Sequence, residues 1–500
     1  MLILIAILFP MIMGIIISLS RLSKKGKRIS YAAALLVTDS LAILSAILSS
    51  PISPLTFSSR VTLSFGFDGL GRFFLSAVLI LYTAVLFYAF EYMEAEEDET
   101  LFFAFYLISL GAMISLSASR NMISLYLSFE FATLSTVPLV LHERSKEAIA
   151  AGLKYLFYSI AGALMGILGI FFLYFYGMED CSFRPGGFLD PQKVAGNEGL
   201  LCIFIFIGIL GFGTKAGLYP MHGWLPTAHP IAPAPASSLL SGIIAKAGIL
   251  AVIRFVFFSS GTDIIRGSWV QYTWLCLAMV TIFMGSMMAF QEKNLKKRLA
   301  YSSVSQISYI MLGLSLLSEE GAIGGLLHLL SHMAAKGCLF LTAGVFIVKL
   351  GKRMVPDLKG LGRSMPITMW CFFLSSLSLV GIPPMGGFVS KWFLSSAAIG
   401  DGMGVFAYLP PIILLVSALL TAGYLFPPVI NAFFPGQDFS EHKEIGVHTD
   451  NPSGQGEGQA KDPSIRMCAP MIVLCILSLC IGLFGNVIAE NLSGFLAACF

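Results

Sequence analysis

The chain has few charged side chains for its length. Of its 500 residues, 12% are Asp, Glu, Lys or Arg, whereas 56% are hydrophobic. This charged share is roughly half that of a typical soluble protein, which excludes a soluble fold of two or three domains. The formal net charge of +3 is also too small to indicate a nucleic acid or another polyanion as a partner.

The nine cysteines form no CxxC pair and are scattered along the chain. Most of them lie inside apolar runs, where a cysteine usually behaves as a small hydrophobic residue. Iron–sulfur clusters and haem groups need ligands at characteristic spacings, and none of these spacings occurs. We therefore expect no redox cofactor and no metal ion in this protein.

No basic residue precedes the first apolar run, at 1–18. The basic cluster at 21–28 follows that run, whereas a signal peptide has the reverse order. We therefore expect the first run to be a retained transmembrane helix.

Apolar segments follow one another from one end of the chain to the other. A helix of about 20 residues crosses the roughly 30 Å hydrocarbon core of a bilayer, and these segments lack the alternation of a barrel strand. In lipid, only helices and closed barrels can hydrogen-bond all of their backbone N–H and C=O groups internally. We therefore expect an all-α integral membrane fold. We predict about fourteen transmembrane helices, at 1–19, 30–49, 70–90, 101–117, 121–140, 147–176, 199–218, 233–258, 269–290, 300–316, 322–349, 366–396, 407–434 and 467–488.

Lys and Arg are distributed unevenly over the loops between these helices. Most of them lie in the loops after the first, fifth, ninth, eleventh and thirteenth predicted helices. Loops rich in Lys and Arg face the cytoplasm, so we expect both termini on the outer side. We expect an acidic inner turn at 91–99 to be solvated, with a docking surface as the alternative.

The predicted helices contain several ionisable side chains, and seven of them form one set of candidates. A charge in the middle of a bilayer costs several kcal/mol unless it has a partner, a water-filled cavity or a role in ion movement. These residues are therefore the candidate functional site. They are Glu130, Lys215, Lys246, His328, His332, Lys336 and Lys391.

His328, His332 and Lys336 follow one another at intervals of four residues. At about 100° per residue they drift only about 80° around a helix, so they line one face about 6 Å apart. Histidine titrates near neutral pH and a buried lysine gives up its proton readily, so such a row can pass protons along. The alternatives are a structural hydrogen-bond seam and a metal site, but the two histidines lack a third ligand and an HExxH glutamate.

Glu130 is one carboxylate among several cations, so its expected role is that of a counter-charge. An ion pair keeps both of its members charged, and separating them lets the lysine lose its proton. A small helix shift would be enough to switch such a pair. A static structural ion pair is the alternative.

Two predicted helices are interrupted by Gly and Pro, at 215–226 and at 381–387. Such breaks are tolerated at membrane depth only where protein or water covers the freed backbone groups. A pair of broken helices in corresponding halves indicates an internal repeat. We expect two five-helix repeats, at 101–260 and 266–434, and their odd helix number gives them opposite topology.

The remaining segments flank these two repeats. Residues 1–100 are predicted to form three N-terminal helices. The Gly-, Asp- and Glu-rich stretch at 435–466 is predicted to be a hydrophilic inner linker. Residues 467–500 would then contain the last transmembrane helix.

The stretch at 220–230, Pro-Met-His-Gly-Trp-Leu-Pro-Thr-Ala-His-Pro, closely resembles a signature of one family. Its members are the antiporter-like, proton-conducting subunits of respiratory complex I, of Mrp-type cation/proton antiporters and of group 4 membrane-bound hydrogenases. Four further segments match this family in the same order. They are Ser128-Phe129-Glu130, Tyr301-Ser302-Ser303 to Gln306, the row from His328 to Lys336, and the stretch from Gly381 to Lys391.

The resemblance implies a fourteen-helix fold with two inverted repeats and discontinuous helices 7 and 12. It implies that Glu130 pairs with Lys215 and that Lys246 lies at the centre of the membrane. The row at 328–336 would then carry protons on to Lys391, near an outer half-channel.

The resemblance also implies a prokaryotic plasma-membrane subunit that works beside further antiporter-like subunits. In this family a peripheral arm performs the redox chemistry, and the subunit itself binds no redox cofactor. We therefore expect a proton-translocating subunit of a redox-driven pump of the complex I or group 4 hydrogenase type. The alternative is a Na⁺/H⁺ antiporter subunit of an Mrp-type complex, because the same polar axis could hydrate Na⁺.

Overall fold

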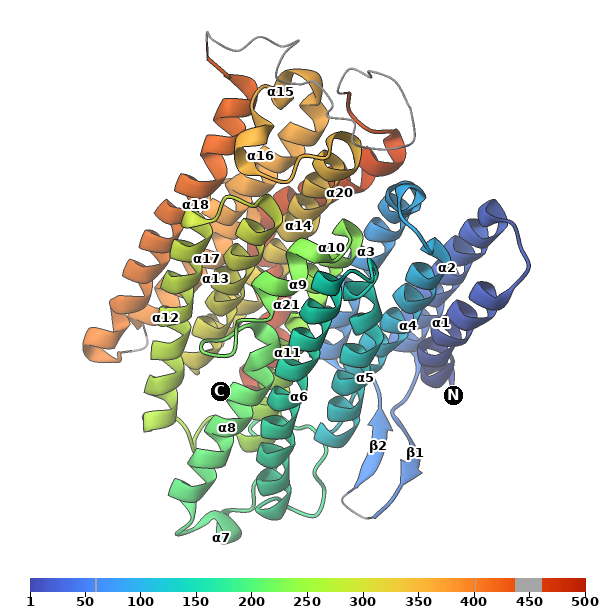
Figure 1. The fold of residues 1–500 in the computed structure, drawn as a ribbon. Coiled ribbons are helices and arrows are strands. Elements are labelled where there is room, and N and C mark those ends of the chain that lie inside the picture. The colour runs from blue at the N-terminus through green and yellow to red at the C-terminus, as the bar shows by residue number, and fades with distance from the viewer. Residues whose placement is uncertain (59–60, 401, 437–460) are drawn as a thin grey trace.

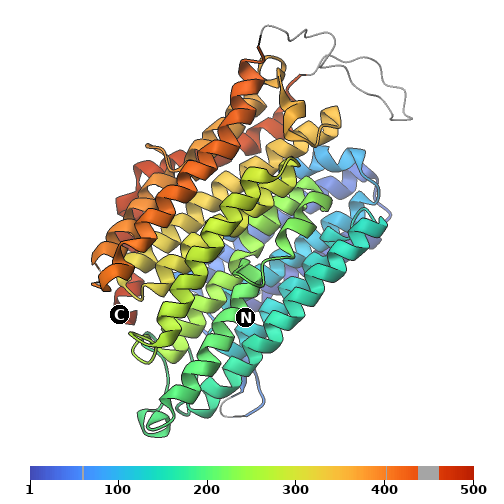
Figure 2. The same cartoon turned by 60° about the vertical axis from the view of Figure 1, so that its left-hand side comes forward.

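The computed structural model describes residues 1–58, 61–400, 402–436 and 461–500. Long helices run side by side along one common direction (Figure 1 and Figure 2). The long helices are α1 (Leu2–Leu19), α2 (Lys24–Leu48), α3 (Gly69–Tyr92), α4 (Glu99–Ala118), α5 (Met122–Val140), α6 (Lys146–Phe175), α8 (Glu198–Ala216), α12 (Trp269–Gln291), α13 (Leu295–Ser315), α14 (Glu319–Leu350), α16 (Pro366–Val380), α17 (Gly386–Gly400), α18 (Leu409–Phe433) and α20 (Ile465–Leu483).

Shorter elements connect or extend these helices. Among them, η2 and η3 are π-helical and the other η elements are 3₁₀-helical. The shorter elements are η1 (Met93–Ala95), α7 (Pro191–Val194), α9 (Leu225–Ile231), α10 (Ala234–Leu239), η2 (Leu240–Ile244), α11 (Lys246–Phe255), η3 (Val256–Ser260), η4 (Val355–Leu358), α15 (Leu361–Ser364), η5 (Gly404–Ala407), α21 (Gly485–Leu496) and η6 (Ala497–Cys499).

Twelve helices within the described residues are long and apolar enough to cross a membrane. They coincide with twelve of the fourteen predicted helices, and the prediction of a helical membrane fold is confirmed. The other two predicted helices differ: α13 begins with a basic, polar turn, and the segment at 366–396 is split into α16 and α17, each of 15 residues. Fourteen crossings, the two inverted repeats and the segment boundaries stay predictions.

A short β-hairpin, which the sequence does not predict, lies between α2 and α3. Strands β1 (Ile52–Thr56) and β2 (Thr62–Phe65) pair antiparallel, with Ile52 opposite Phe65. Figure 1 shows the hairpin at the same end of the molecule as α7 and the two termini, whereas α15 lies at the other end. That both termini lie on the outer side of the membrane stays a prediction.

The predicted inner regions are only partly visible. The linker predicted at 435–466 lies for the most part outside the described residues. Several acids of the turn at 91–99 pair with basic residues of the chain itself. Arg28 pairs with Glu94 and Glu99, and Lys349 pairs with Glu91 at 3.0 Å.

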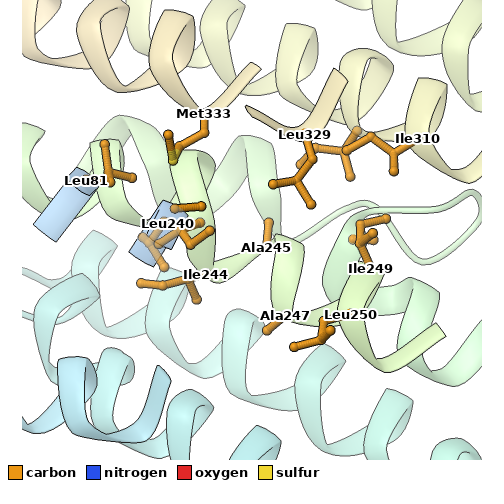
Figure 3. Close-up of a cluster of buried hydrophobic side chains, with 14 of the residues drawn as sticks. Leu81, Leu240, Ile244, Ala245, Ala247, Ile249, Leu250, Ile310, Leu329 and Met333 are labelled. Atoms are coloured by element: carbon orange, nitrogen blue, oxygen red, sulfur yellow. The ribbon is translucent and has the colours of Figure 1, made fainter. Parts of the chain in front are cut away.

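The helical stretch at 234–260, formed by α10, η2, α11 and η3, lies at the centre of the molecule. Its most apolar part is buried completely inside the protein. Figure 3 shows Leu240 and Ile244 of η2 gathered with Leu81 of α3 and Met333 of α14. The packing is close, because a Cβ on Gly242 would lie 2.3 Å from Cδ2 of Leu81. The π-helical turn η2 immediately precedes Lys246, and π-bulges of this kind often accompany functional sites.

The two predicted helix breaks are present. α8 ends at Gly217 with φ of 80°, and α16 ends at Gly381 with φ of 92°, a left-handed conformation that favours glycine. At the second break, a Cβ on Gly387 would lie 1.8 Å from the carbonyl oxygen of Ser378. The start of α17 therefore rests directly on the backbone of α16, which fixes where Lys391 lies.

An ion pair near the hairpin joins α3 to α11. The two guanidinium nitrogens of Arg254 donate to the two carboxylate oxygens of Asp68 at 2.6 Å each, and Arg120 adds a bond of 3.2 Å. Arg254 is 1% exposed and lies against the rings of Phe183 and Phe258. Burial raises the pKa of the Asp68 carboxyl, but the two arginines lower it by more, so it lies below its ordinary value.

Asp68→Asn should destabilise the protein by about 3–5 kcal/mol, because it leaves Arg254 buried without its counter-charge. The measurement is the unfolding temperature of the purified chain in detergent, with Asp180→Asn as the control. Asp180 pairs with Arg184 at an exposed site, and such pairs contribute at most about 1 kcal/mol.

The same pair predicts a pH dependence. The folded-state pKa of Asp68 is lowered, so its contribution is complete above the ordinary value of 3.8 and is lost as the pH falls below it. The Asp68→Asn variant should lose less stability than the parent chain over this acidic range. Equal unfolding temperatures at neutral pH would contradict both expectations.

Gly387→Ala should lower the unfolding temperature, because the added methyl group overlaps the Ser378 carbonyl. Overpacking of this kind costs about 1–3 kcal/mol, and a backbone neighbour yields less than a side chain. Gly400→Ala at the other end of α17 is the control, since nothing lies within 4 Å of its added Cβ. An unchanged unfolding temperature in Gly387→Ala would contradict the close packing of α17 against the Ser378 carbonyl.

Candidate functional site

Helices that are distant in sequence bring most of the predicted ionisable residues into one buried region. The residues and their elements are Glu130 on α5, Lys215 on α8, Lys246 at the start of α11, His328, His332 and Lys336 on α14, and Lys391 on α17.

Lys246 and His332 are in direct contact at the centre of the site. The Lys246 Nζ lies 2.6 Å from Nδ1 of His332 and donates a second hydrogen bond to the carbonyl of Ser241. Both side chains are fully buried. Since an ammonium group can only donate, His332 accepts at Nδ1 when Lys246 is charged, and its proton is then on Nε2. That Nε2 has no hydrogen-bond partner among the described residues.

His328 lies one turn before His332, and the centroids of the two rings are 6.1 Å apart. Its Nδ1 is 2.9 Å from the hydroxyl of Ser390, and its ring stacks on Tyr309 at 5.0 Å. Its Nε2, like that of His332, has no partner within the part of the chain that the structure describes. Two neighbouring buried rings therefore each carry one nitrogen without a partner, which a bridging water could connect.

Lys391 continues this line on α17, next to Ser390. Its Nζ donates to the carbonyls of Leu379 and Val380, at 2.7 and 2.8 Å, and lies 5.2 Å from the ring centroid of Tyr309. These carbonyls belong to the last turn of α16, where helix carbonyls lack intrahelical partners and carry partial negative charge. The break predicted from Gly and Pro thus supplies the acceptors that hold Lys391.

Lys336 connects to Lys246 by a different route, through α13. Its Nζ donates to the carbonyl of Leu299 at 2.8 Å, and Ser303 Oγ donates to the same carbonyl at 3.0 Å. Ser303 Oγ lies 2.6 Å from Ser241 Oγ, and the backbone of Ser241 accepts from Lys246. The row of three residues therefore divides. His332 contacts Lys246 directly, whereas Lys336 is linked to it through the Leu299 carbonyl, the hydroxyls of Ser303 and Ser241, and the Ser241 backbone.

Glu130 and Lys215 do not form the expected ion pair. The Lys215 Nζ donates to Oγ1 of Thr133, one turn along α5 from Glu130, and lies 4.7 Å from the centroid of the Phe129 ring. Oε1 of Glu130 has no hydrogen-bond partner among the described residues. The two charges still interact through space. The expectation of direct pairing is wrong for this conformation, because a hydroxyl and an aromatic face take the ammonium instead.

His229 belongs to the sequence signature at 220–230 but is not among the site residues predicted from the sequence. It is fully buried on α9, and neither ring nitrogen has a partner in the described part of the chain. Its ring stacks on Phe340 at 4.9 Å, and the Lys336 Nζ lies 6.0 Å from the centroid of that same ring. Lys296 donates to the carbonyls of Pro230 and Ala232, which follow His229 in the chain, at 3.3 and 2.5 Å.

The two histidines of α14 are not placed as metal ligands. Within the described residues, no group of three His, Cys, Asp or Glu side chains that could hold an ion includes either of them. The lysine contact of His332 and the serine contact of His328 are instead contacts that a proton relay needs.

Comparison with known proteins assigns the chain to a family. The sequence profile described as "NADH:quinone oxidoreductase/Mrp antiporter, TM" matches residues 119–421. NADH-quinone oxidoreductase subunit N of Desulforudis audaxviator is 32% identical over 416 residues, which cover 82% of this chain and 79% of that protein. Hydrogenase-4 component B of Escherichia coli is 31% identical over 343 residues, 65% of this chain and 49% of that protein. A Na⁺/H⁺ antiporter subunit of Alkalihalophilus pseudofirmus is 27% identical, and the match covers 76% of each chain.

Solved structures share the fold over the whole chain. A chain of the membrane-bound sulfane sulfur reductase, an archaeal respiratory complex, superposes with a TM-score of 0.82 at 20% identity, covering 99% of this chain and 97% of that chain. For a chain of the Mrp complex from Dietzia sp. the TM-score is 0.80 at 22% identity, with 100% and 97% covered. For one of respiratory complex I from Thermus thermophilus it is 0.79 at 21% identity, with 100% and 99% covered.

The resemblance carried by the motifs is thereby confirmed, and the chain belongs to the family of antiporter-like membrane subunits found in NADH:quinone oxidoreductases and Mrp antiporters.

Proposed function

We propose that this chain is a proton-translocating subunit of a redox-driven ion pump of the complex I or group 4 hydrogenase type, in a prokaryotic plasma membrane. Other membrane subunits of the same complex are its partners, and a peripheral arm supplies the electron transfer. The observation that carries the proposal is the buried line of titratable groups from Lys246 through His332 and His328 to Lys391. The named relatives support the type of complex.

The contacts of each ring support transfer along this line. Lys246 gives its proton to Nδ1 of His332, which releases the proton on its Nε2, because an imidazole can accept at one nitrogen and donate from the other. A water between the two free Nε2 atoms carries the proton to His328. Nδ1 of His328 then passes it to the hydroxyl of Ser390. From there it would reach the next residue, Lys391, the last group before the predicted outer side.

Proton uptake is proposed to run through His229. Lys296, which holds the two carbonyls beside His229, lies at the start of α13, close enough to the inner-loop acids Glu96 and Glu143 to interact with them. These acids would concentrate protons at the mouth of the path. The two free nitrogens of His229 could take up a proton there and pass it past Phe340 toward Lys336.

Glu130 and Lys215 would act as the switch. The conformation described here is the separated one, in which Thr133 holds the ammonium group. A shift of α5 against α8 by about one turn's spacing would bring the carboxylate to Lys215 and hold the lysine charged. A change of charge in a neighbouring subunit would drive the exchange between the two arrangements.

Antiport of Na⁺ is the second candidate, supported by the similarity to a Na⁺/H⁺ antiporter subunit. The site itself favours protons. Na⁺ is a hard cation that needs oxygen ligands, and the axis offers one carboxylate against four lysines. A row of positively charged lysines repels a metal cation. It can still pass a proton, because each lysine that gives up a proton takes up another and its charge is unchanged after the transfer.

Lys246→Ala should abolish proton pumping by the assembled complex, because it removes the group that donates to His332. The measurement is proton uptake into inverted membrane vesicles while electrons are transferred, with assembly of the complex checked by blotting. Lys193→Ala, which removes a partly exposed lysine of α7, should pump at the parent rate. Correctly assembled Lys246→Ala complexes that pump normally would refute the proposed route.

His229→Phe should slow pumping at least ten-fold, since a positioned proton carrier contributes about 10²–10⁴-fold to a transfer. His229→Gln keeps the polar character of the site but cannot be protonated in this pH range, so it should be slow as well. A full pumping rate in His229→Gln would show that His229 only hydrates the path.

A further inference from the structure

Three cysteines from three different helices meet in the interior of the protein. They are Cys338 of α14, Cys371 of α16 and Cys475 of α20, and all three are buried. Their sulfur atoms lie within 4.8 Å of one another, and those of Cys338 and Cys475 are 3.6 Å apart. The sequence could not reveal this cluster, because its members are far apart in the chain.

The spacing of the sulfurs fits a metal ion. Thiolate sulfur lies about 2.3 Å from an ion such as zinc, so three sulfurs in a plane around one ion are about 4 Å apart. The observed separations, from 3.6 Å to less than 4.8 Å, bracket this value. An ion could therefore enter with side-chain adjustment alone. A disulfide would use only two of the three thiols and would leave the convergence of the third unexplained.

The surroundings select the kind of ion. Among the described residues, no carboxylate or imidazole group belongs to the cluster, so hard cations such as Mg²⁺ and Ca²⁺ find no suitable ligands in it. The nearest added polar groups are the Ser375 hydroxyl, 3.5 Å from the Cys475 sulfur, and the Cys371 carbonyl, 3.5 Å from the same atom. Zinc favours four ligands of the thiolate or imidazole kind, whereas soft sulfur ligands alone favour Cu(I).

A groove leads to the cluster from the outer surface of the bundle. Its volume is about 360 Å³, and Cys371 and Cys475 form part of its lining together with apolar side chains such as Trp370 and Ile472. The cluster is therefore closed on the side of α14 and reachable from the side of α16 and α20.

We propose that Cys338, Cys371 and Cys475 form a binding site for a soft monovalent ion of the Cu(I) class. Binding of one Cu⁺ to three thiols releases one proton to water, so the product, one thiolate and two thiols around the ion, is neutral. Neutrality suits an apolar setting, where a net charge would be costly. Because a proton is released, affinity rises with pH.

A bound ion would clamp the three helices that carry the cluster. α14 also carries His332 and Lys336, and the last turn of α16 holds Lys391. Joining them to α20 would fix α14 against α16, the two helices that hold the line from His332 to Lys391, and so slow proton transfer along that line. This consequence rests on the proposed function, whereas ion binding itself does not.

Binding is tested on the full chain in its assembled complex, with Ag⁺ as a redox-inert probe of the same class. Competition against a soluble chelator should show one tight site per chain, and its affinity should fall at least 100-fold in Cys338→Ser and Cys475→Ser. Ag⁺ should also raise the unfolding temperature of the parent chain only. Cys276→Ser is the matched control, a cysteine of α12 outside the cluster, and should behave as the parent does.

Two results would overturn the site. One is equal Ag⁺ affinity in the parent chain and in Cys338→Ser. The other is a thiol titration of the denatured, unreduced parent that finds two fewer than its nine thiols, with none missing in Cys338→Ser, which would show a disulfide. Pumping assays separate the two proposals: silver should slow the parent but not Cys338→Ser. Tight binding without slowing would refute the clamp, whereas a complex that never pumps would refute the proposed function alone.

Discussion

The structure depends on how four lysines are held inside a bilayer-spanning bundle with one carboxylate among them. Lys215, Lys246, Lys336 and Lys391 cannot all find a counter-charge, and even the pairing of Lys215 with Glu130 is not made. Neutral oxygens hold them instead: a hydroxyl for Lys215 and backbone carbonyls for the other three. A neutral acceptor stabilises an ammonium group less than a carboxylate does, so these protons are held weakly enough to move.

Irregular backbone supplies several of these acceptors. The carbonyl that accepts from Lys246 belongs to the π-helical η2, and those that accept from Lys391 belong to the broken end of α16. A straight α-helix would use such carbonyls for its own hydrogen bonds. The Asp68–Arg254 pair differs from the buried lysines. Two opposite charges meet there with two hydrogen bonds, so the pair joins helices and offers no proton for transfer.

The sequence predicts those features that depend on local pattern. Apolar length marks the helices, intervals of four residues align His328 with His332, and Gly with Pro marks the break at Gly381. The sequence does not predict contacts that depend on how one helix is rotated against another. Lys246 and His332 are 86 residues apart, and nothing in their spacing indicates that they touch. The same reason explains why the contact between Lys215 and Thr133 and the cysteine cluster were not predicted.

The most direct test of the account is the water structure of the assembled complex, determined by electron cryomicroscopy at a resolution that shows single waters. The account predicts ordered water between the Nε2 atoms of His332 and His328, and water that links His229 to Lys336. Both gaps closed by apolar side chains, with no water density between these groups, would contradict the proton route.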